Sequence, residues 1–202
     1  MSIFLIRHGE TLGNFSRIVQ VAGSPLSPRG IAQAERLGRR LATAGIGGIL
    51  SSDLARALMT AERLRQDTGA SLEIDPLLQE RSFGDIRGTP YADLDFDMFA
   101  PDYEPPGGES WMAFHARVDG AWALVQAVAA RTEGHLAVVT HGLVCRSLAE
   151  RHLILPAGEA VPARWENTSV TIADGPAPWR VTLLNCSTHL AAGEALPNSA
   201  PA

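Results

Sequence analysis

The sequence predicts an α/β domain with a mostly parallel sheet, because short apolar runs alternate along the chain with segments of helical periodicity. The apolar runs at residues 3–6 and within 135–140 are expected to form strands that are buried on both faces of this sheet. The remaining expected strands are shorter or alternate apolar with polar residues, and they cover 49–50, 72–74, 169–173 and 179–184.

Helices are expected between these strands. Ser27 and Pro28 are a typical N-cap and first helical residue, and apolar side chains then recur at helical spacing as far as Leu41. The segment 51–53, which reads Ser-Ser-Asp, is a second cluster of N-cap residues and predicts a helix that ends near residue 66. Two further helices, of which the first is the longest expected in the chain, cover 110–130 and 142–152.

The length of 202 residues and the lack of an obvious linker indicate one compact domain. We expect this domain to cover residues 1–190. Residues 85–108 are rich in Asp, Pro and Gly, and the part at 89–108 is interpreted as an insertion that forms a lid. The tail at 191–202 is small, polar and contains proline, so we expect it to be disordered.

The charged residues narrow the classes of function. The net charge of −5 provides no electrostatic footprint for a nucleic-acid partner. All 17 basic side chains are arginine, which excludes a Schiff-base lysine and a Walker-type phosphate loop. Any phosphate must therefore be held by arginine, histidine, backbone N–H groups and small polar side chains, and the planar guanidinium suits phosphate oxygens well.

Several other features are not expected in this protein. Cys145 and Cys186 lie far apart in the sequence, so neither a zinc site nor a disulfide framework is predicted. No Asp or His cluster has the spacing of metal ligands, and we expect no metal and no cofactor. The apolar run at 3–6 is too short for a signal peptide, and no segment is long enough to span a membrane. A cytoplasmic location follows as an expectation, and a homodimer is left open.

Polar residues follow three of the expected strands, at the edge where open parallel sheets bind their ligands. These residues are Arg7-His8, Ser51-Ser52 and Thr140-His141. The helix after Ser51-Ser52 carries Arg56 in its first turn, where free backbone N–H groups also favour a phosphate.

The segment at 5–11, Leu-Ile-Arg-His-Gly-Glu-Thr, followed by Asn14, resembles the signature of the histidine phosphatase superfamily, also called the phosphoglycerate mutase-like superfamily. Four further segments resemble that family in its own order, at 24–34, 51–60, 80–88 and 138–142. The resemblance extends over about residues 3–146, and five ordered segments make it specific. It implies a three-layer α/β/α sandwich and a phosphoryl-transfer enzyme that acts on a small phosphorylated molecule.

The resemblance also implies roles for five side chains. His8 is the candidate nucleophile, and Arg7 and Arg56 would clamp the phosphate. Their charges would lower the pKa of His8, and only the neutral imidazole can attack phosphorus. His141 would contact the transferred phosphoryl group and stabilise its developing charge. Glu80 is the candidate general acid, which protonates the leaving oxygen and then activates water.

Three substrate-binding candidates complete the expected site. Asn14, as in the family, would donate a hydrogen bond to the phosphate, although it could instead cap a turn. Arg81 either contacts the substrate or braces its loop, and the sequence leaves both readings open. Ser110 follows Glu109, and together they most simply cap the longest helix. Because some family members use this region near the substrate, Ser110 is kept as a candidate.

The superfamily contains both phosphatases and cofactor-dependent mutases. The mutases carry paired arginines in the insertion after the acid-bearing segment, whereas residues 89–108 here contain five carboxylates and no arginine. A lid of like charge would repel a polyanion, which favours a phosphatase and a leaving group with little negative charge. We therefore expect a phosphoric monoester hydrolase of the histidine acid phosphatase type. A mutase is the alternative, and an inactive phosphate-binding or scaffold protein is the least favoured.

One motif departs from the family. Many of its phosphatases have Trp-Glu-Gly after the acid-bearing segment, whereas this chain has Ile86-Arg87-Gly88. The departure leaves the subfamily open and does not touch the five candidate side chains around the phosphate.

Overall fold

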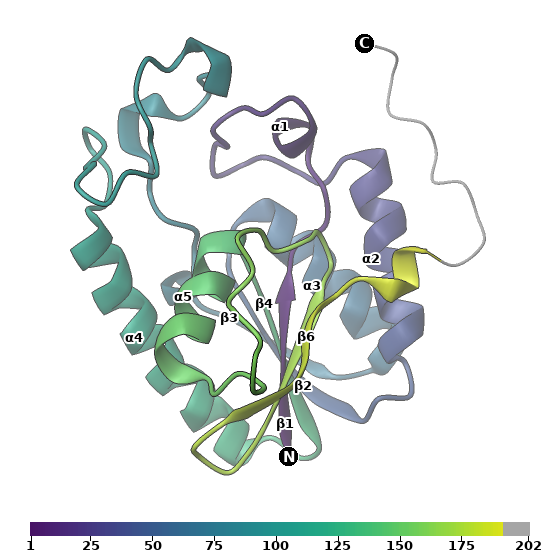
Figure 1. Ribbon diagram of the computed structural model, residues 1–202. Helices are drawn as coiled ribbons and strands as arrows, with labels where there is room; N and C mark the ends of the chain where they lie inside the picture. Colours follow the sequence, from purple (N-terminus) through teal and green to yellow (C-terminus); the bar gives the residue numbers. More distant parts are fainter. Residues whose placement is uncertain (192–202) are drawn as a thin grey trace.

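A computed structural model describes residues 1–191 and contains a six-stranded sheet in the order β3-β2-β4-β1-β5-β6 (Figure 1). The first four strands of the chain pair with one another in parallel, in the order β3-β2-β4-β1. In contrast, β5 pairs antiparallel with both β1 and β6. The strands are β1 (Ser2–Arg7), β2 (Ile46–Ser51), β3 (Ser71–Ile74), β4 (His135–Thr140), β5 (Val170–Asp174) and β6 (Arg180–Cys186). The predicted mostly parallel sheet is confirmed.

Helices cover both faces of the sheet. The α-helices are α1 (Leu12–Phe15), α2 (Pro28–Leu41), α3 (Ala55–Thr68), α4 (Trp111–Arg131) and α5 (Gly142–His152). The short 3-10 helices are η1 (Pro76–Leu78), η2 (Gly84–Ile86), η3 (Tyr91–Asp93) and η4 (Thr188–Leu190). As predicted, Ser27 caps α2, and its hydroxyl accepts a hydrogen bond from the N–H of Gly30 at 3.0 Å.

The alternation of side chains along β1 divides the core into two layers. Ile3 and Leu5 pack with α4 and α5, whereas Phe4 and Ile6 pack with α2 and α3 on the opposite face. Because every one of these four side chains is buried, β1 reads in the sequence as a continuous apolar run. The result is the three-layer α/β/α sandwich implied by the family resemblance.

Two local predictions were wrong. β2 begins at Ile46 and includes two glycines that the sequence placed outside the strand. A Cβ atom on Gly47 would lie 1.7 Å from the carbonyl oxygen of Glu133, in the segment just before β4. Only glycine therefore lets β2 approach that segment so closely. The segment 51–53 does not cap α3, because Leu54 is the N-cap and provides no side-chain hydrogen bond. Ser51 remains in β2, and the hydroxyl of Ser52, which precedes the N-cap, accepts a hydrogen bond from the N–H of Leu54 at 3.3 Å.

The carboxyl ends of β1, β2 and β4 reach the same edge of the sheet, since Arg7 pairs with Thr140 and Ser51 with Val139. Two irregular segments rise beyond this edge in Figure 1, one around α1 and the other at residues 85–108. The second segment contains two of the 3-10 helices and packs through Met98 on a small apolar cluster with Val19 and Phe83.

Disorder was predicted for residues 191–202, and all of these except Ala191 lie outside the described residues. Over residues 1–191, no helix combines the length and the apolar character needed to cross a lipid bilayer.

Candidate active site

His8 lies directly after β1 and is buried. Its Nδ1 atom is 2.7 Å from the carbonyl oxygen of Gly9, which can only accept a hydrogen bond, so we assign the ring hydrogen to Nδ1. Nε2 then carries the lone pair, and it accepts a hydrogen bond from Nε of Arg56 at 3.2 Å. The backbone therefore orients the imidazole and leaves Nε2 as its nucleophilic atom.

The environment of His8 keeps its ring uncharged. Burial, followed by the charges of Arg56 and Arg7, holds the pKa of His8 well below its usual range. Arg56 remains charged at neutral pH, because burial and the like charges of Arg7 and Arg87 lower its pKa only to about 10. A neutral imidazole beside two guanidinium groups is the arrangement expected for attack on a phosphate.

His141 lies next to His8, with the two ring centroids 5.1 Å apart. It is fully buried, and its Nε2 atom lies 2.9 Å from the hydroxyl oxygen of Ser52. Burial and the charges around it, with Arg56 first among them, hold the pKa of His141 well below its usual value. Ser52 thus orients this histidine.

Among the buried nitrogens that have no hydrogen-bond partner within residues 1–191 are Nε of Arg7, which lines the cavity, and Nδ1 of His141, which lies against His8. Arg7 is anchored by its Nη1 atom, which donates to the carbonyl oxygen of Trp165. Buried polar groups are normally satisfied, so unpaired nitrogens beside the nucleophile are available to phosphate oxygens.

The loop after His8 is held from two sides. The N–H of Gly9 donates to the hydroxyl of Thr60 at 3.1 Å, and the N–H of Glu10 donates to the side chain of Gln33 at 2.8 Å. The carboxylate of Glu10 accepts hydrogen bonds from Ser27 and Arg29, both at 3.1 Å. Glu10 therefore orients the loop.

Glu80 is partly buried and lines the same cavity as His8. Its two carboxylate oxygens accept hydrogen bonds from the N–H groups of Arg81 and Leu143 at 3.1 and 3.2 Å. Removal from water nevertheless raises the pKa of Glu80, against the opposing effect of these hydrogen bonds. A raised pKa suits a carboxyl group that must both donate and accept a proton near neutral pH.

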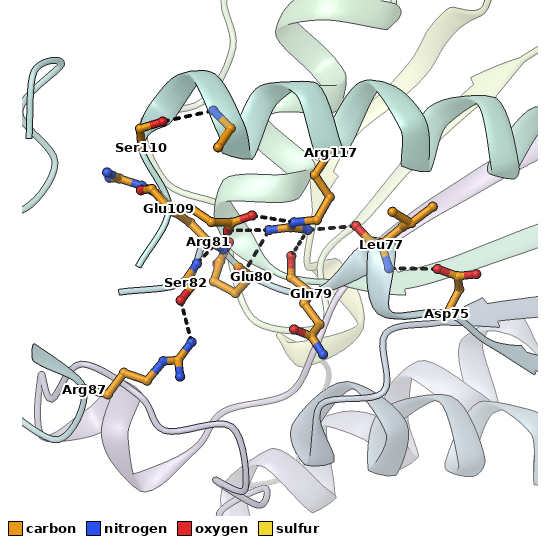
Figure 2. A network of polar contacts seen from close by, with 11 residues as sticks. Asp75, Leu77, Gln79, Glu80, Arg81, Ser82, Arg87, Glu109, Ser110 and Arg117 are labelled. Carbon is orange, nitrogen blue, oxygen red and sulfur yellow. Dashed lines mark hydrogen bonds and ion pairs between the residues drawn. The ribbon is translucent and has the colours of Figure 1, made fainter. Parts of the chain in front are cut away.

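Arg117 fastens the segment that carries Glu80 to helix α4. Its guanidinium donates to the carbonyl oxygens of Leu77 and Gln79, both at 2.8 Å, and to that of Glu80 at 3.3 Å. It also forms an ion pair with Glu109 at 2.7 Å, and the carboxylate of Glu109 accepts from the N–H of Ser82 (Figure 2). One side chain thus fixes the backbone on both sides of Glu80.

Replacing Arg117 with leucine is expected to lower the free energy of unfolding by about 2–3 kcal/mol, because three carbonyl oxygens and one carboxylate lose a charged donor. Urea unfolding would measure this. Arg131→Leu on the same helix is the matched control, since Arg131 is exposed and its ion pair within residues 1–191 is with Glu73, whose side chain is 43% exposed. That control should change stability by less than about 0.5 kcal/mol. Equal losses in both variants would contradict a special role for Arg117.

The three weaker candidates have different outcomes. Asn14 lines the cavity and also caps α1, where its side-chain oxygen accepts from the N–H of Thr11 at 3.3 Å. Arg81 is buried, and its three nitrogens donate to the carbonyl oxygens of Glu109, Met98 and Tyr103 at 3.0, 3.4 and 2.6 Å. Its guanidinium also lies 4.0 Å from the ring of Trp111. This geometry favours the loop-bracing reading of Arg81.

Ser110 is not among the residues that line the cavity. Its hydroxyl accepts a hydrogen bond from the N–H of Ala113 at 3.1 Å, which makes it the N-cap of α4 (Figure 2). The capping role is therefore present in the structure, and the substrate contact of Ser110 stays a prediction. Glu109 does not cap the helix, because its carboxylate pairs with Arg117.

The sequence reasoning missed two residues that hold the nucleophile. Asn167 donates from its side chain to the carbonyl oxygen of His8 at 2.9 Å and lies 3.4 Å from the side-chain oxygen of Asn14. Trp165 supplies the carbonyl oxygen that anchors Arg7. Both follow the last motif segment, and no local pattern marks them in the sequence.

A cavity of about 490 Å³ is lined by Arg7, His8, Asn14, Arg56, Glu80, Arg81 and Trp165, whereas His141 is not among its lining residues. Arginines from four other places also line it, namely Arg17, Arg87, Arg146 and Arg164. Of residues 89–108, only Tyr91 and Phe99 are in the lining, and Glu80 is the one carboxylate among the lining residues. The premise that an acidic lid faces the substrate is therefore wrong, because the five carboxylates of this segment lie outside the cavity wall.

Known proteins are similar to this chain in sequence and in fold. A family model described as the histidine phosphatase superfamily, branch 1, matches residues 3–186. The Proteus mirabilis protein named "Probable phosphoglycerate mutase GpmB" is 32% identical over 190 residues, which cover 89% of this chain and 87% of that protein.

Two solved phosphatase structures are similar over most of their length. A mycobacterial glucosyl-3-phosphoglycerate phosphatase in complex with VO3 has a TM-score of 0.77 and 27% identity, over 91% of this chain and 98% of its own. The alpha-ribazole phosphatase of Shigella flexneri has a TM-score of 0.78 and 26% identity, over 93% and 97%. Since the family match spans nearly the whole described chain, this protein belongs to the histidine phosphatase superfamily.

Proposed function

We propose that the protein is a phosphatase that hydrolyses small-molecule phosphomonoesters through a covalent phosphohistidine on His8. The observation that carries this proposal is the orientation of the His8 ring, whose Nδ1 is 2.7 Å from the carbonyl oxygen of Gly9 while Nε2 accepts a hydrogen bond from Arg56 at 3.2 Å. A buried imidazole held in this way is poised to react with phosphorus and needs no metal to activate it.

In the first step, Nε2 of His8 bonds to phosphorus as the ester P–O bond breaks. Arg7 and Arg56 line the cavity beside His8 and stabilise the charge that develops on the phosphoryl oxygens, and His141 lies against His8 with the two ring centroids 5.1 Å apart. The protonated carboxyl of Glu80 gives its proton to the leaving oxygen, which departs as an alcohol. The N–H group at Nδ1 keeps its hydrogen bond to the carbonyl oxygen of Gly9, and this hydrogen bond stabilises the positive charge of the phosphorylated imidazole ring.

In the second step, the carboxylate of Glu80 takes a proton from water as the water oxygen bonds to phosphorus. The P–N bond breaks, its electron pair returns to Nε2, and phosphate leaves. Glu80 is protonated again and His8 is neutral again, so one water molecule is consumed in each cycle.

A mutase is the second candidate, because the similar Proteus mirabilis protein has a mutase name whereas the two similar solved structures have phosphatase names. The two activities share the first step and differ in what accepts the phosphoryl group. The histidine acid phosphatase subclass, a cytoplasmic location and a homodimer stay predictions.

The assay that separates these functions supplies a phosphorylated sugar acid and measures released phosphate and isomer exchange together. We expect phosphate release to exceed exchange, at the same rate with and without excess EDTA, because arginine and histidine supply the charge that a metal would otherwise supply. Exchange faster than release would favour the mutase. Loss of release in EDTA would contradict metal independence, and no turnover of any phosphomonoester would favour a scaffold protein.

A further inference from the structure

Four arginines line the cavity beyond the group that surrounds His8. They are solvent-exposed and come from separate segments: Arg17 follows α1, Arg87 follows η2, Arg146 belongs to α5, and Arg164 lies in the loop before β5. Because four separate segments each bring a cation to the same cavity, we infer that these arginines have a common electrostatic role there.

Most of these charges have no close counter-charge. Within residues 1–191, neither Arg17 nor Arg87 has a carboxylate oxygen within 4.0 Å. Arg17 lies over the ring of Tyr91 at 5.6 Å, and Arg87 donates to the hydroxyl of Ser82 at 2.7 Å. The contact of Arg164 with Glu166 is 4.0 Å long and exposed on both sides. The electrostatic field of these three guanidinium groups is therefore hardly neutralised by nearby carboxylates.

Arg146 differs because it forms an exposed ion pair with Glu150 on the next turn of α5, at 2.8 Å. Such i,i+4 pairs at a surface are weak, so a substrate anion can compete for the guanidinium. The ester phosphate itself is matched by Arg7 and Arg56, which are buried at the bottom of the site. The field of the outer four arginines therefore remains after the phosphate is bound.

The like charges also act on the inner site. Arg164 is among the groups that lower the pKa of Arg7, and Arg87 is among those that lower the pKa of Arg56. An anion near the outer arginines would relieve this repulsion. Part of the cavity lining is aromatic, since Tyr91 and Phe99 pack edge to face with their ring centroids 6.4 Å apart and both line the cavity. It offers a surface for the carbon skeleton between two anionic ends.

We propose that the physiological substrate carries a second anionic group on its leaving side, a carboxylate or a further phosphate, which Arg17, Arg87, Arg146 and Arg164 bind at the outer part of the cavity. This rests on the proposed phosphatase activity and defines its substrate class as phosphate esters of organic acids. It replaces the expectation of a leaving group with little charge, which relied on residues 89–108 alone.

The test compares two probe substrates that differ at one end. Glycerate 3-phosphate and glycerol 3-phosphate are both esters of a primary alcohol, and the first has a carboxylate where the second has a hydroxymethyl group. We expect kcat/KM for phosphate release to be at least about tenfold higher for the glycerate, because a charge-assisted hydrogen bond is worth this much in a partly exposed site. Raising the salt concentration should reduce the ratio.

Variants assign the effect to the outer arginines. Arg17→Gln and Arg164→Gln should each reduce the ratio of the two kcat/KM values several-fold, and the double variant should reduce it further. Arg180→Gln is the matched control, because Arg180 is exposed on β6 and does not line the cavity. The ratio in this control should equal that of the unmodified protein.

The outcomes separate the two proposals. Equal kcat/KM for both substrates, or a preference for glycerol 3-phosphate, would overturn the second-anion site if p-nitrophenyl phosphate is still hydrolysed. A ratio that the arginine variants leave unchanged would overturn it too. Failure to hydrolyse any of the three esters would instead overturn the phosphatase activity on which the inference rests.

Discussion

Replacing His8 with asparagine is expected to lower kcat for phosphomonoester hydrolysis by roughly 10⁴-fold or more, the usual consequence of removing a covalent nucleophile. The asparagine amide can still donate a hydrogen bond but has no basic nitrogen lone pair, so no bond to phosphorus can form. Stability should change little by comparison, since the carbonyl oxygen of Gly9 can keep a donor near it.

Rapid acid quenching with ³²P-labelled substrate would check the mechanism directly. In the unmodified protein, the label should appear on His8 in a linkage that acid breaks and base preserves, and His8→Asn should carry none. His152→Asn is the matched control, because His152 pairs with Asp119 at 2.8 Å and does not line the cavity. Label on another side chain, or turnover without a labelled protein, would refute a phosphohistidine at this position.

The sequence predicted the sheet and the inner site for a physical reason. Strands buried on both faces leave a continuous apolar signal, and the carboxyl ends of parallel strands meet at one edge. Two strand-end pairs, Arg7-His8 and Thr140-His141, therefore had to lie together once β1 and β4 paired. The motif at 80–88 added Glu80, whose place in the cavity no strand-end rule could give.

The cavity wall was not predictable in the same way. Arg17 and Arg164 belong to irregular segments without periodicity, so their positions depend on long-range packing. Asn167 reaches the carbonyl oxygen of His8 across 159 positions of sequence, and nothing local signals that contact. The error about the lid had the same origin, because the sequence shows that residues 89–108 are acidic but not which side chains point inward.

Replacing Glu80 with glutamine is expected to lower kcat by about 10²–10⁴-fold for alkyl phosphates, whose alkoxide leaving groups need a proton. The loss should be much smaller for p-nitrophenyl phosphate in the first step, because p-nitrophenolate leaves without protonation. A burst of p-nitrophenol followed by slow steady-state turnover is therefore expected, since the variant has no carboxylate to activate water in the second step. Glu159→Gln, an exposed change outside the cavity, is the matched control.

The pH dependence provides a second measure of the same group. Because the pKa of Glu80 is raised, its protonated form persists to higher pH than that of an ordinary carboxyl, and protonation of the leaving group fails as pH rises through that pKa. His8 remains neutral throughout this range, because its pKa is held well below the usual value. The ionisation of His8 should therefore add no further limb to the plot of kcat/KM against pH. For an alkyl phosphate with the first step rate-limiting, the descending limb of kcat/KM should be present in the unmodified protein and absent in Glu80→Gln. A limb that survives the substitution, or equal losses for alkyl and aryl esters, would place the proton donor on another side chain.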